Sequence, residues 1–143
     1  MKQFEITTEA ISVDDVVNRV NTPTIGAVTT FVGVVRGSTG GRPVRYLEYE
    51  AYPEMAEASL GEIGTEIRNQ WATINQVAIV HRIGQLNVGE ISVVIALAAA
   101  HRQDTFEALH YAIDRLKEIV PIWKKEVWMD GEEWRSETSN SPC

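Results

Sequence analysis

The sequence predicts an α+β domain with mixed or antiparallel sheets, in the order β-α-β-β-α-β-β-α-β-β. Two observations lead to this order. Three segments carry apolar residues at helical spacing, and the segments between them are rich in β-branched and aromatic residues. A length of 143 residues is enough for one hydrophobic core without disulfides or metal ions. We therefore expect residues 1–135 to form a single domain.

The first part of the chain predicts three strands and one helix. Residues 4–8 alternate apolar and polar side chains, as a half-buried strand does. Ser12 offers a helix N-cap with an acid three residues later, which predicts a helix over residues 13–21. Residues 25–36 and 44–50 are β-rich, and the stretch between them is rich in glycine. We expect these two strands to form a hairpin with a mobile tip.

A second helix is expected over residues 53–71. Pro53 suits the first turn of a helix, where no N–H donor is needed, and apolar residues then follow at imperfect helical spacing up to Trp71. Gly61 and Gly64 lower the helix propensity of this segment. We expect them to permit close packing against a neighbouring element.

Residues 74–84 and 90–100 predict two buried strands joined by a turn at residues 87–89, and we expect the two strands to pair. Asp104 and Glu107 then resemble a capping box at the start of a third helix.

Pro121 ends the third helix, because proline disrupts a helix and makes the preceding residue extended. Residues 123–128 and 133–135 flank an Asp-Gly turn and predict a terminal hairpin. The polar residues 136–143 are expected to be a flexible tail.

Composition excludes several classes of function. A net charge of −7 argues against general nucleic-acid binding, which needs a basic surface. The chain has no signal-peptide pattern and no apolar run long enough to cross a membrane, so we expect a cytoplasmic protein without a membrane partner. The single cysteine, Cys143, is poorly placed for catalysis, and no metal-binding or nucleophile motif is present. We therefore predict no metal and no cofactor.

Three of the four lysines lie close together, on either side of Pro121. Lys117 falls in the last turn of the third helix, whereas Lys124 and Lys125 follow the proline on a strand. This cluster predicts a site for an anion. The alternative is that Lys117 only complements the helix dipole and that the other two lysines face solvent. Because neighbouring strand residues face opposite ways, the sequence does not decide which of Lys124 and Lys125 faces the site.

Other basic residues lie at or just after the ends of predicted strands. Arg36 follows one buried strand, and His101 and Arg102 lie between another strand and the third helix, where backbone N–H groups favour anions. Each of them could equally be a solvated loop residue. His81 lies inside a predicted strand and is interpreted as a structural histidine with satisfied hydrogen bonds, not as a ligand. Arginine, histidine and lysine are left as the candidate chemical groups, which suits a phosphorylated or other anionic substrate.

Five short motifs, in order along the chain, resemble the family of the large, catalytic subunit of molybdopterin synthase. They cover most of residues 25–135, and they are Thr30-Phe-Val-Gly-Val-Val-Arg36, Leu47-Glu-Tyr-Glu-Ala-Tyr-Pro-Glu-Met55, His81-Arg-Ile-Gly-Gln-Leu-Asn-Val-Gly-Glu90, Ala100-His-Arg102, and Leu116-Lys117 with Pro121-Ile-Trp-Lys-Lys-Glu126.

The resemblance implies an α/β hammerhead-type fold and a homodimer that binds two ubiquitin-like small subunits, making a heterotetramer. It implies a sulfurtransferase of molybdenum cofactor biosynthesis. The substrate would be cyclic pyranopterin monophosphate (precursor Z), and each small subunit would supply one sulfur from its C-terminal thiocarboxylate to form molybdopterin.

The resemblance also assigns roles to particular residues. Lys117 matches the essential lysine of the family, and Lys124 matches a second active-site lysine. Arg36, His101 and Arg102 match a pocket for the substrate's phosphate and pterin, with His101 and Arg102 contributed across the dimer interface, and Phe31 matches an aromatic residue of the pocket wall.

Two other hypotheses remain beside the synthase. The same dimer and groove could bind a ubiquitin-like tail without catalysis. Alternatively, Lys117 could form a Schiff base with a carbonyl substrate, as lysines do in another class of enzyme.

Overall fold

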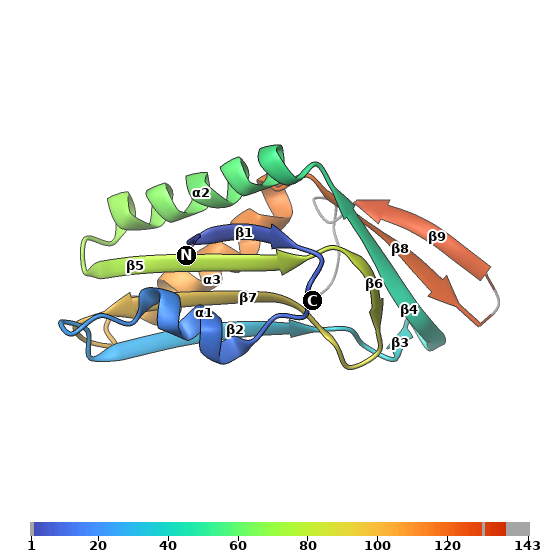
Figure 1. The fold of residues 1–143 in the computed structure, drawn as a ribbon, viewed down its shortest axis with the longest axis horizontal. Coiled ribbons are helices and arrows are strands. Elements are labelled where there is room, and N and C mark those ends of the chain that lie inside the picture. Colours follow the sequence, from blue (N-terminus) through green and yellow to red (C-terminus); the bar gives the residue numbers. More distant parts are fainter. Residues whose placement is uncertain (1, 130, 137–143) are drawn as a thin grey trace.

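The computed structural model describes residues 2–129 and 131–136, in which two sheets and three helices are formed (Figure 1). The first sheet has the strand order β1-β5-β7-β2. Its strands are β1 (Phe4–Thr7), β5 (Ile74–Arg82), β7 (Ile91–Ala99) and β2 (Ala27–Val34). β1 runs parallel to β5, and the other neighbours are antiparallel, so the predicted mixed sheet is confirmed.

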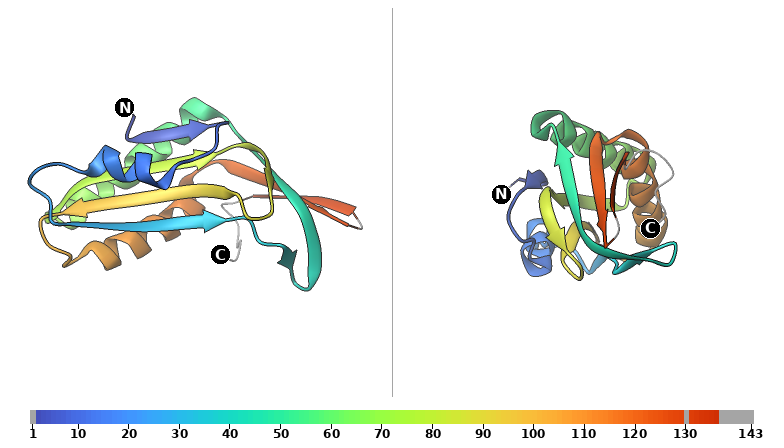
Figure 2. Two further views of the ribbon diagram at one scale, coloured as in Figure 1. Left: turned by 60° about the horizontal axis from the view of Figure 1, so that its bottom comes forward. Right: turned by 90° about the vertical axis from the view of Figure 1, so that its right-hand side faces the viewer.

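Helices cover both faces of this sheet, as Figure 2 shows. They are α1 (Val13–Val20), α2 (Pro53–Gln70) and α3 (Thr105–Ile119). Because strand side chains alternate between faces, β7 sends Val94, Ala96 and Ala98 toward α1 and the residues between them toward α2 and α3. Both faces are therefore apolar, which explains why the sequence of β7 is apolar almost throughout.

The second sheet lies at one end of the first and is inclined to it (Figure 1). Its strand order is β3-β4-β8-β9, and β6 also pairs with β4. These strands are β3 (Ser38–Thr39), β4 (Arg42–Ala51), β8 (Ile122–Trp128), β9 (Gly131–Ser136) and β6 (Gly84–Asn87). The long strand β4 thus pairs along its length with the chain segment that follows α3.

Two predictions about connectivity can be compared with this topology. The expected hairpin between residues 25–36 and 44–50 is wrong, because β2 pairs with β7 and β4 pairs with β8. Only the two-residue strand β3, inside the predicted loop, pairs with β4 as a hairpin. The expected pairing of residues 74–84 with residues 90–100 is confirmed, and so is the terminal hairpin of β8 and β9.

Of the two N-caps predicted for helices, one is confirmed and the other is wrong. The Ser12 hydroxyl accepts a hydrogen bond from the Asp15 N–H, as predicted for α1. The capping box of Asp104 and Glu107 is wrong. Asp104 has a left-handed backbone with φ of 72° and makes no side-chain cap. Its carboxylate instead accepts a hydrogen bond from Thr73 at 3.0 Å, which ties the start of α3 to the loop before β5.

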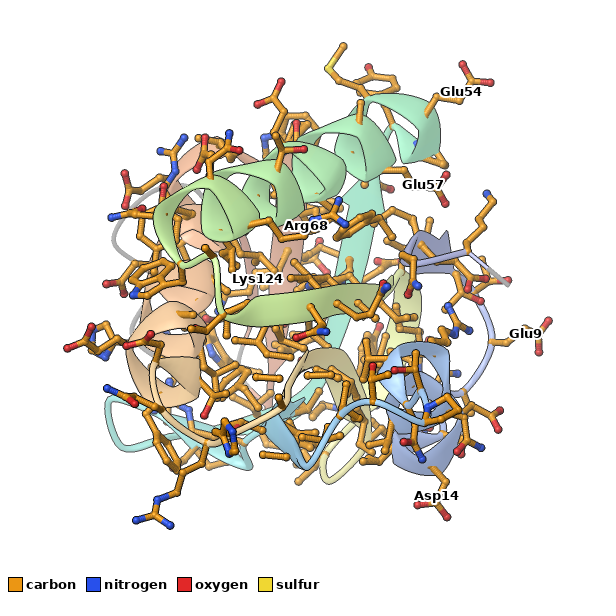
Figure 3. All side chains as sticks on the ribbon, turned by 90° about the vertical axis from the view of Figure 1, so that its left-hand side faces the viewer. Glu9, Asp14, Glu54, Glu57, Arg68 and Lys124 are labelled. Atoms are coloured by element: carbon orange, nitrogen blue, oxygen red, sulfur yellow. The ribbon has the colours of Figure 1, made fainter. Side chains whose placement is uncertain are left out.

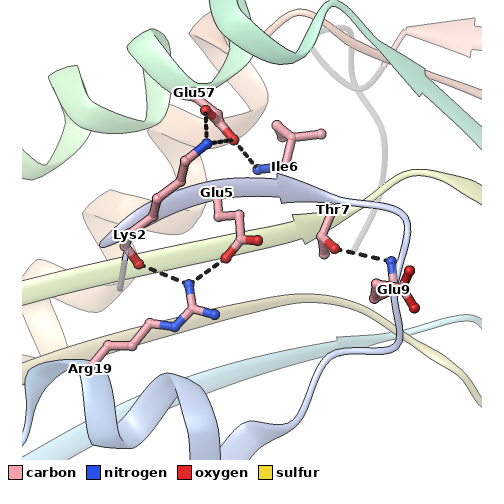
Figure 4. Close-up of polar contacts among 7 residues, drawn as sticks. All are labelled: Lys2, Glu5, Ile6, Thr7, Glu9, Arg19 and Glu57. Atoms are coloured by element: carbon pink, nitrogen blue, oxygen red, sulfur yellow. Dashed lines mark hydrogen bonds and ion pairs between the residues drawn. The ribbon is translucent and has the colours of Figure 1, made fainter.

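The N-terminal strand is fastened to two helices (Figure 4). The Glu57 carboxylate of α2 accepts hydrogen bonds from the Lys2 ammonium at 3.0 Å and from the Ile6 N–H at 2.9 Å. On the other side, the Arg19 guanidinium of α1 donates to Glu5 at 2.7 Å. These contacts hold β1 at the edge of the first sheet.

A polar clamp fixes α3 to α2. The Arg115 guanidinium binds both carboxylate oxygens of Glu66, at 2.9 and 3.0 Å, and the Tyr111 hydroxyl donates to the same carboxylate at 2.6 Å. The hydrogen bonds from Arg115 and Tyr111 lower the pKa of Glu66, so the pair stays ionised. Because Arg115 lies two residues before Lys117, the clamp also holds the last turn of α3 in place.

Residues 137–143 lie outside the described residues, and so does most of the predicted flexible tail. Ser136, its first residue, is the last residue of β9. In the part of the chain that is described, no helix is both long and apolar enough to cross a membrane.

Candidate active site

A cavity of about 320 Å³ opens where the two sheets meet the C-terminal end of α3. Its walls come from β2 and the segment after it, β3, β4, β5, β7, α3 and β8, so they combine segments far apart in the sequence. The polar and aromatic lining residues are Phe31, Arg36, Thr39, Tyr49, His81, Ser92, Lys117, Lys124 and Glu126. A volume of this size is at the lower end of the range of small-molecule sites in proteins.

The absence of a side chain at Gly33 helps to leave this space open. A β-carbon at this position of β2 would lie 2.7 Å from a methyl group of Val93 and 3.2 Å from the Ser92 hydroxyl, both cavity-lining residues. A larger residue at position 33 would therefore press on the wall of the cavity.

Four of the six residues to which the resemblance gave roles line this one cavity. Phe31 comes from β2, Arg36 from the loop after it, Lys117 from the last turn of α3, and Lys124 from β8. The helix ends at Ile119, just before Pro121, as predicted. The chain then turns into β8, which brings Lys124 to the same cavity as Lys117.

The two adjacent lysines of β8 face opposite ways. Lys124 is only 8% exposed and lies among the enclosed side chains in Figure 3, in contrast to Glu9, Asp14 and Glu54, which point outward. The Lys125 ammonium lies 3.0 Å from a Glu48 carboxylate oxygen and is absent from the cavity lining. The hydrogen bond with Glu48 raises the pKa of Lys125, which keeps it protonated.

Glu126 is a cavity residue that the sequence reasoning did not select. Its side chain is buried, with 2% exposed, and accepts a hydrogen bond from the Trp128 indole N–H at 3.1 Å. A carboxylate oxygen lies 3.9 Å from the Lys124 ammonium. The signal in the sequence was the two-residue spacing from Lys124, which puts both side chains on one face of a strand.

His81 is buried, as the interpretation of it as a structural residue requires, but it also lines the cavity. Its Nδ1 lies 2.8 Å from the Arg82 carbonyl oxygen. Its ring meets the Tyr49 ring edge to face, with centroids 5.0 Å apart. The sequence reasoning therefore identified its burial but not its position at the site.

His101 and Arg102 are not part of this cavity within one chain. Both are exposed and lie just beyond the C-terminal end of β7, where Ala99 pairs with Ala27. The cavity residues of the same sheet lie toward the opposite end, where Ile95 pairs with Phe31. In the described residues, no group of three or more histidine, cysteine, aspartate or glutamate side chains could hold a metal ion.

The family model described as "MoaE protein" matches residues 6–119, which is most of the chain. This chain belongs to the MoaE family.

Curated MoaE relatives carry an enzyme's name. Proteins named "Molybdopterin synthase catalytic subunit" from Halalkalibacterium halodurans and Bacillus subtilis are each 49% identical to this chain. The first alignment covers 99% of this chain and 92% of the relative, and the second covers 94% and 85%. The predicted role is therefore confirmed: this MoaE protein is an enzyme of molybdenum cofactor biosynthesis, a molybdopterin synthase catalytic subunit.

Solved structures of similar chains have the same fold. The crystal structure of molybdopterin synthase from Staphylococcus aureus superposes with a TM-score of 0.90 at 49% identity, covering 94% of this chain and 98% of that chain. A chain from a complex of subunits 1 and 2 of molybdopterin-converting factor of Helicobacter pylori has a TM-score of 0.74 and 17% identity, over 96% of this chain and 91% of that chain. The second likeness concerns the fold alone. The predicted α+β class is confirmed.

Proposed function

We propose that this chain converts cyclic pyranopterin monophosphate into molybdopterin inside the cavity between the two sheets. The sulfur donor is the C-terminal thiocarboxylate of a ubiquitin-like small subunit, and two donors act in turn. The observation that carries the proposal is that Arg36, Lys117 and Lys124 line one cavity together with Phe31.

The lining suits each part of such a reaction. Arg36 can donate charge-assisted hydrogen bonds to the phosphate of the substrate, and Phe31 gives an apolar wall for the flat pterin. Lys117 and Lys124 are the amines beside the reacting carbon atoms. Negative charge develops there when the thiocarboxylate adds and when a carboxylate or water leaves, and ammonium groups stabilise that charge and transfer protons.

A homodimer would complete the site. β2 is an edge strand of the first sheet, and Thr30 and Val34 on it are exposed. If two copies pair through β2 about a two-fold axis, the strands run antiparallel, and the start of one lies beside the end of the other. Because Ala27 at the start of β2 pairs with Ala99, the nearby His101 and Arg102 of the second copy would approach Arg36.

The partners proposed are therefore a second copy of this chain and two small subunits, together a heterotetramer. The name of the curated relatives, a catalytic subunit, fits an enzyme that works with another subunit. We also propose that the enzyme works in the cytoplasm, as the sequence led us to expect.

The test is the formation of molybdopterin on mixing the purified chain with a thiocarboxylated small subunit and cyclic pyranopterin monophosphate. The native chain should form product, and Lys117→Ala should lower the rate by about a hundredfold or more, because an amine that transfers protons and stabilises charge is lost. Binding of the small subunit should be unchanged. No product from the native chain, with the small subunit bound, would contradict the proposal and favour a binding module.

A further inference from the structure

His81 is a buried ionisable side chain of the cavity that the proposed function does not use. It belongs to β5 and lies on the same face as Val77 and Ile79, the face covered by α2 and α3. Only 1% of the residue is exposed, yet it lines the cavity. A histidine that served only to fill an apolar core would not need to border this polar space.

The contact with the backbone determines which nitrogen of the His81 ring carries the proton. Nδ1 lies 2.8 Å from the carbonyl oxygen of Arg82, and a carbonyl oxygen can only accept a hydrogen bond. Nδ1 is therefore the donor. In the neutral ring, Nε2 then carries the lone pair and is the acceptor.

The groups around the same cavity have other roles. Tyr49 on β4 packs edge to face against the histidine ring at 5.0 Å. The Glu126 carboxylate on β8 accepts a hydrogen bond from Trp128 and lies 3.9 Å from the Lys124 ammonium. Lys117 on α3, Lys124 on β8 and Arg36 after β2 bring positive charge. Among the lining side chains, His81 is the one that carries an imidazole, a group that can both accept and release a proton.

The proposed sulfur transfer contains a step that needs such an acceptor. When the thiocarboxylate sulfur bonds to a carbon of the pterin substrate, the donor's acyl carbon remains attached to that sulfur as a thioester. Water must then release the small subunit. Its oxygen bonds to the acyl carbon, the carbon–sulfur bond breaks, and the bonding electron pair stays on the sulfur, which remains on the pterin. One proton of the water goes to a base, and the other ionises from the carboxylic acid formed.

We infer that His81 Nε2 accepts the proton from the water that cleaves this thioester. The imidazolium then passes the proton to the departing thiolate or to solvent, and the ring is ready for the second sulfur. This role rests on the proposed function. It differs from the roles given to Lys117 and Lys124, because their ammonium groups stabilise negative charge and donate protons, whereas His81 accepts one.

The test is a single turnover of the native chain and of His81→Asn with thiocarboxylated small subunit and cyclic pyranopterin monophosphate, stopped at intervals and weighed by mass spectrometry. The asparagine amide can still donate to the Arg82 carbonyl but has no basic nitrogen. We expect the covalent adduct of small subunit and pterin to form at the native rate and then to decay about 10²–10⁴-fold more slowly. The native decay rate should fall toward acidic pH, and the variant should lose this dependence.

The matched control is His110→Asn, which changes an exposed histidine on α3 that pairs with Asp114 and should leave both rates unchanged. An unchanged decay rate in His81→Asn would overturn the inference. An equal slowing of adduct formation and decay would also overturn it, because a merely structural role predicts that result. If the native chain itself forms neither adduct nor product with the small subunit bound, the proposed function is what fails.

A second measurement needs no variant of His81. Nitrogen NMR of the native chain, with its three histidines assigned, should show the His81 proton on Nδ1 at neutral pH. A proton on Nε2 in the neutral ring would overturn the inference, even if His81→Asn does not fold. Should that variant unfold, His81→Gln takes its place in the single-turnover experiment, because it fills the position of Nε2 with an amide that is not a base.

Discussion

Lys124 and Lys125 are neighbours with different surroundings. Lys124 lies buried at the cavity beside Glu126, whereas Lys125 forms ion pairs with Glu48 and Glu132 outside it. Alternation along β8 separates the two side chains, because successive strand residues point to opposite faces. The resemblance had favoured Lys124 for the site, but the spacing alone left both open.

Removing the charge of each lysine should therefore have unequal effects. Lys124→Met keeps most of the aliphatic chain but removes the ammonium from the cavity. We expect it to lower the rate of molybdopterin formation by about a hundredfold. Lys125→Met is the matched control and should stay within about threefold of the native rate, since the ion pairs of Lys125 with Glu48 and Glu132 lie outside the cavity. Rates measured in the same assay check this, and equal losses in both variants would contradict the placement of Lys124.

The sequence alone indicated some residues of the site more clearly than others. Lys117 and Arg36 stand out in the sequence because they follow clear helix and strand patterns. Glu126 is indicated only by its two-residue spacing from Lys124, and His81 does not stand out, because a histidine within a strand gives no sign of what lies opposite it. Only the approach of β5, β8 and α3 shows that both line one cavity.

Among the elements, α2 illustrates how a weak helix former can be required by packing. A β-carbon at Gly64 would collide with the ring of Phe4 on β1. At Gly61, one turn earlier, the nearest atom of the same ring would be 3.9 Å away, an ordinary contact. The expectation that these glycines permit close packing thus applies to Gly64.

Alanine at the two glycines should change stability in opposite directions. Gly64→Ala should lower the free energy of unfolding by about 1–3 kcal/mol, because overpacking outweighs the gain in helix propensity. Gly61→Ala should raise it by up to about 1 kcal/mol, because alanine favours the helix and has room. Urea denaturation of both variants measures the difference. A gain in stability at both positions would show that Phe4 does not pack on Gly64.

The pairing of strands was less predictable than their existence. Residues 25–36 and 44–50 are both β-rich, and a short glycine-rich connection normally favours a hairpin. In this fold the chain passes from one sheet to the other at that connection, so β2 and β4 find partners much later in the sequence. Local patterns cannot indicate this, because the competing partners have equally β-rich sequences.

At the scale of the whole molecule, the proposed dimer predicts that two inactive variants regain activity when they exchange subunits. If His101 and Arg102 act on the partner's cavity, a dimer of Lys117→Ala with Arg102→Ala contains one cavity with both defects and one with neither. Each variant alone should have little activity. Random exchange of subunits makes half of the dimers mixed, so activity should recover to about a quarter of the native value.

Recovery is measured by molybdopterin formation after the two variants have exchanged subunits, with the mixed dimer verified by mass spectrometry. The control mixture pairs Lys117→Ala with Lys124→Ala, two changes in the same cavity. In its mixed dimers each cavity carries one defect, so no activity should return. Mixed dimers of the first pair that stay inactive would contradict a site shared across β2.

The sequence by itself determined the family, the α+β order of elements and the cluster of basic residues around Pro121. These features are local: periodicity, turn residues and short motifs are properties of neighbouring positions in the chain. The tertiary structure decided that β2 and β4 belong to different sheets, that Lys124 and not Lys125 faces the cavity, and that His81 and Glu126 lie there too. Those outcomes depend on which distant segments bury one another's apolar faces, and burial is a property of the folded chain as a whole.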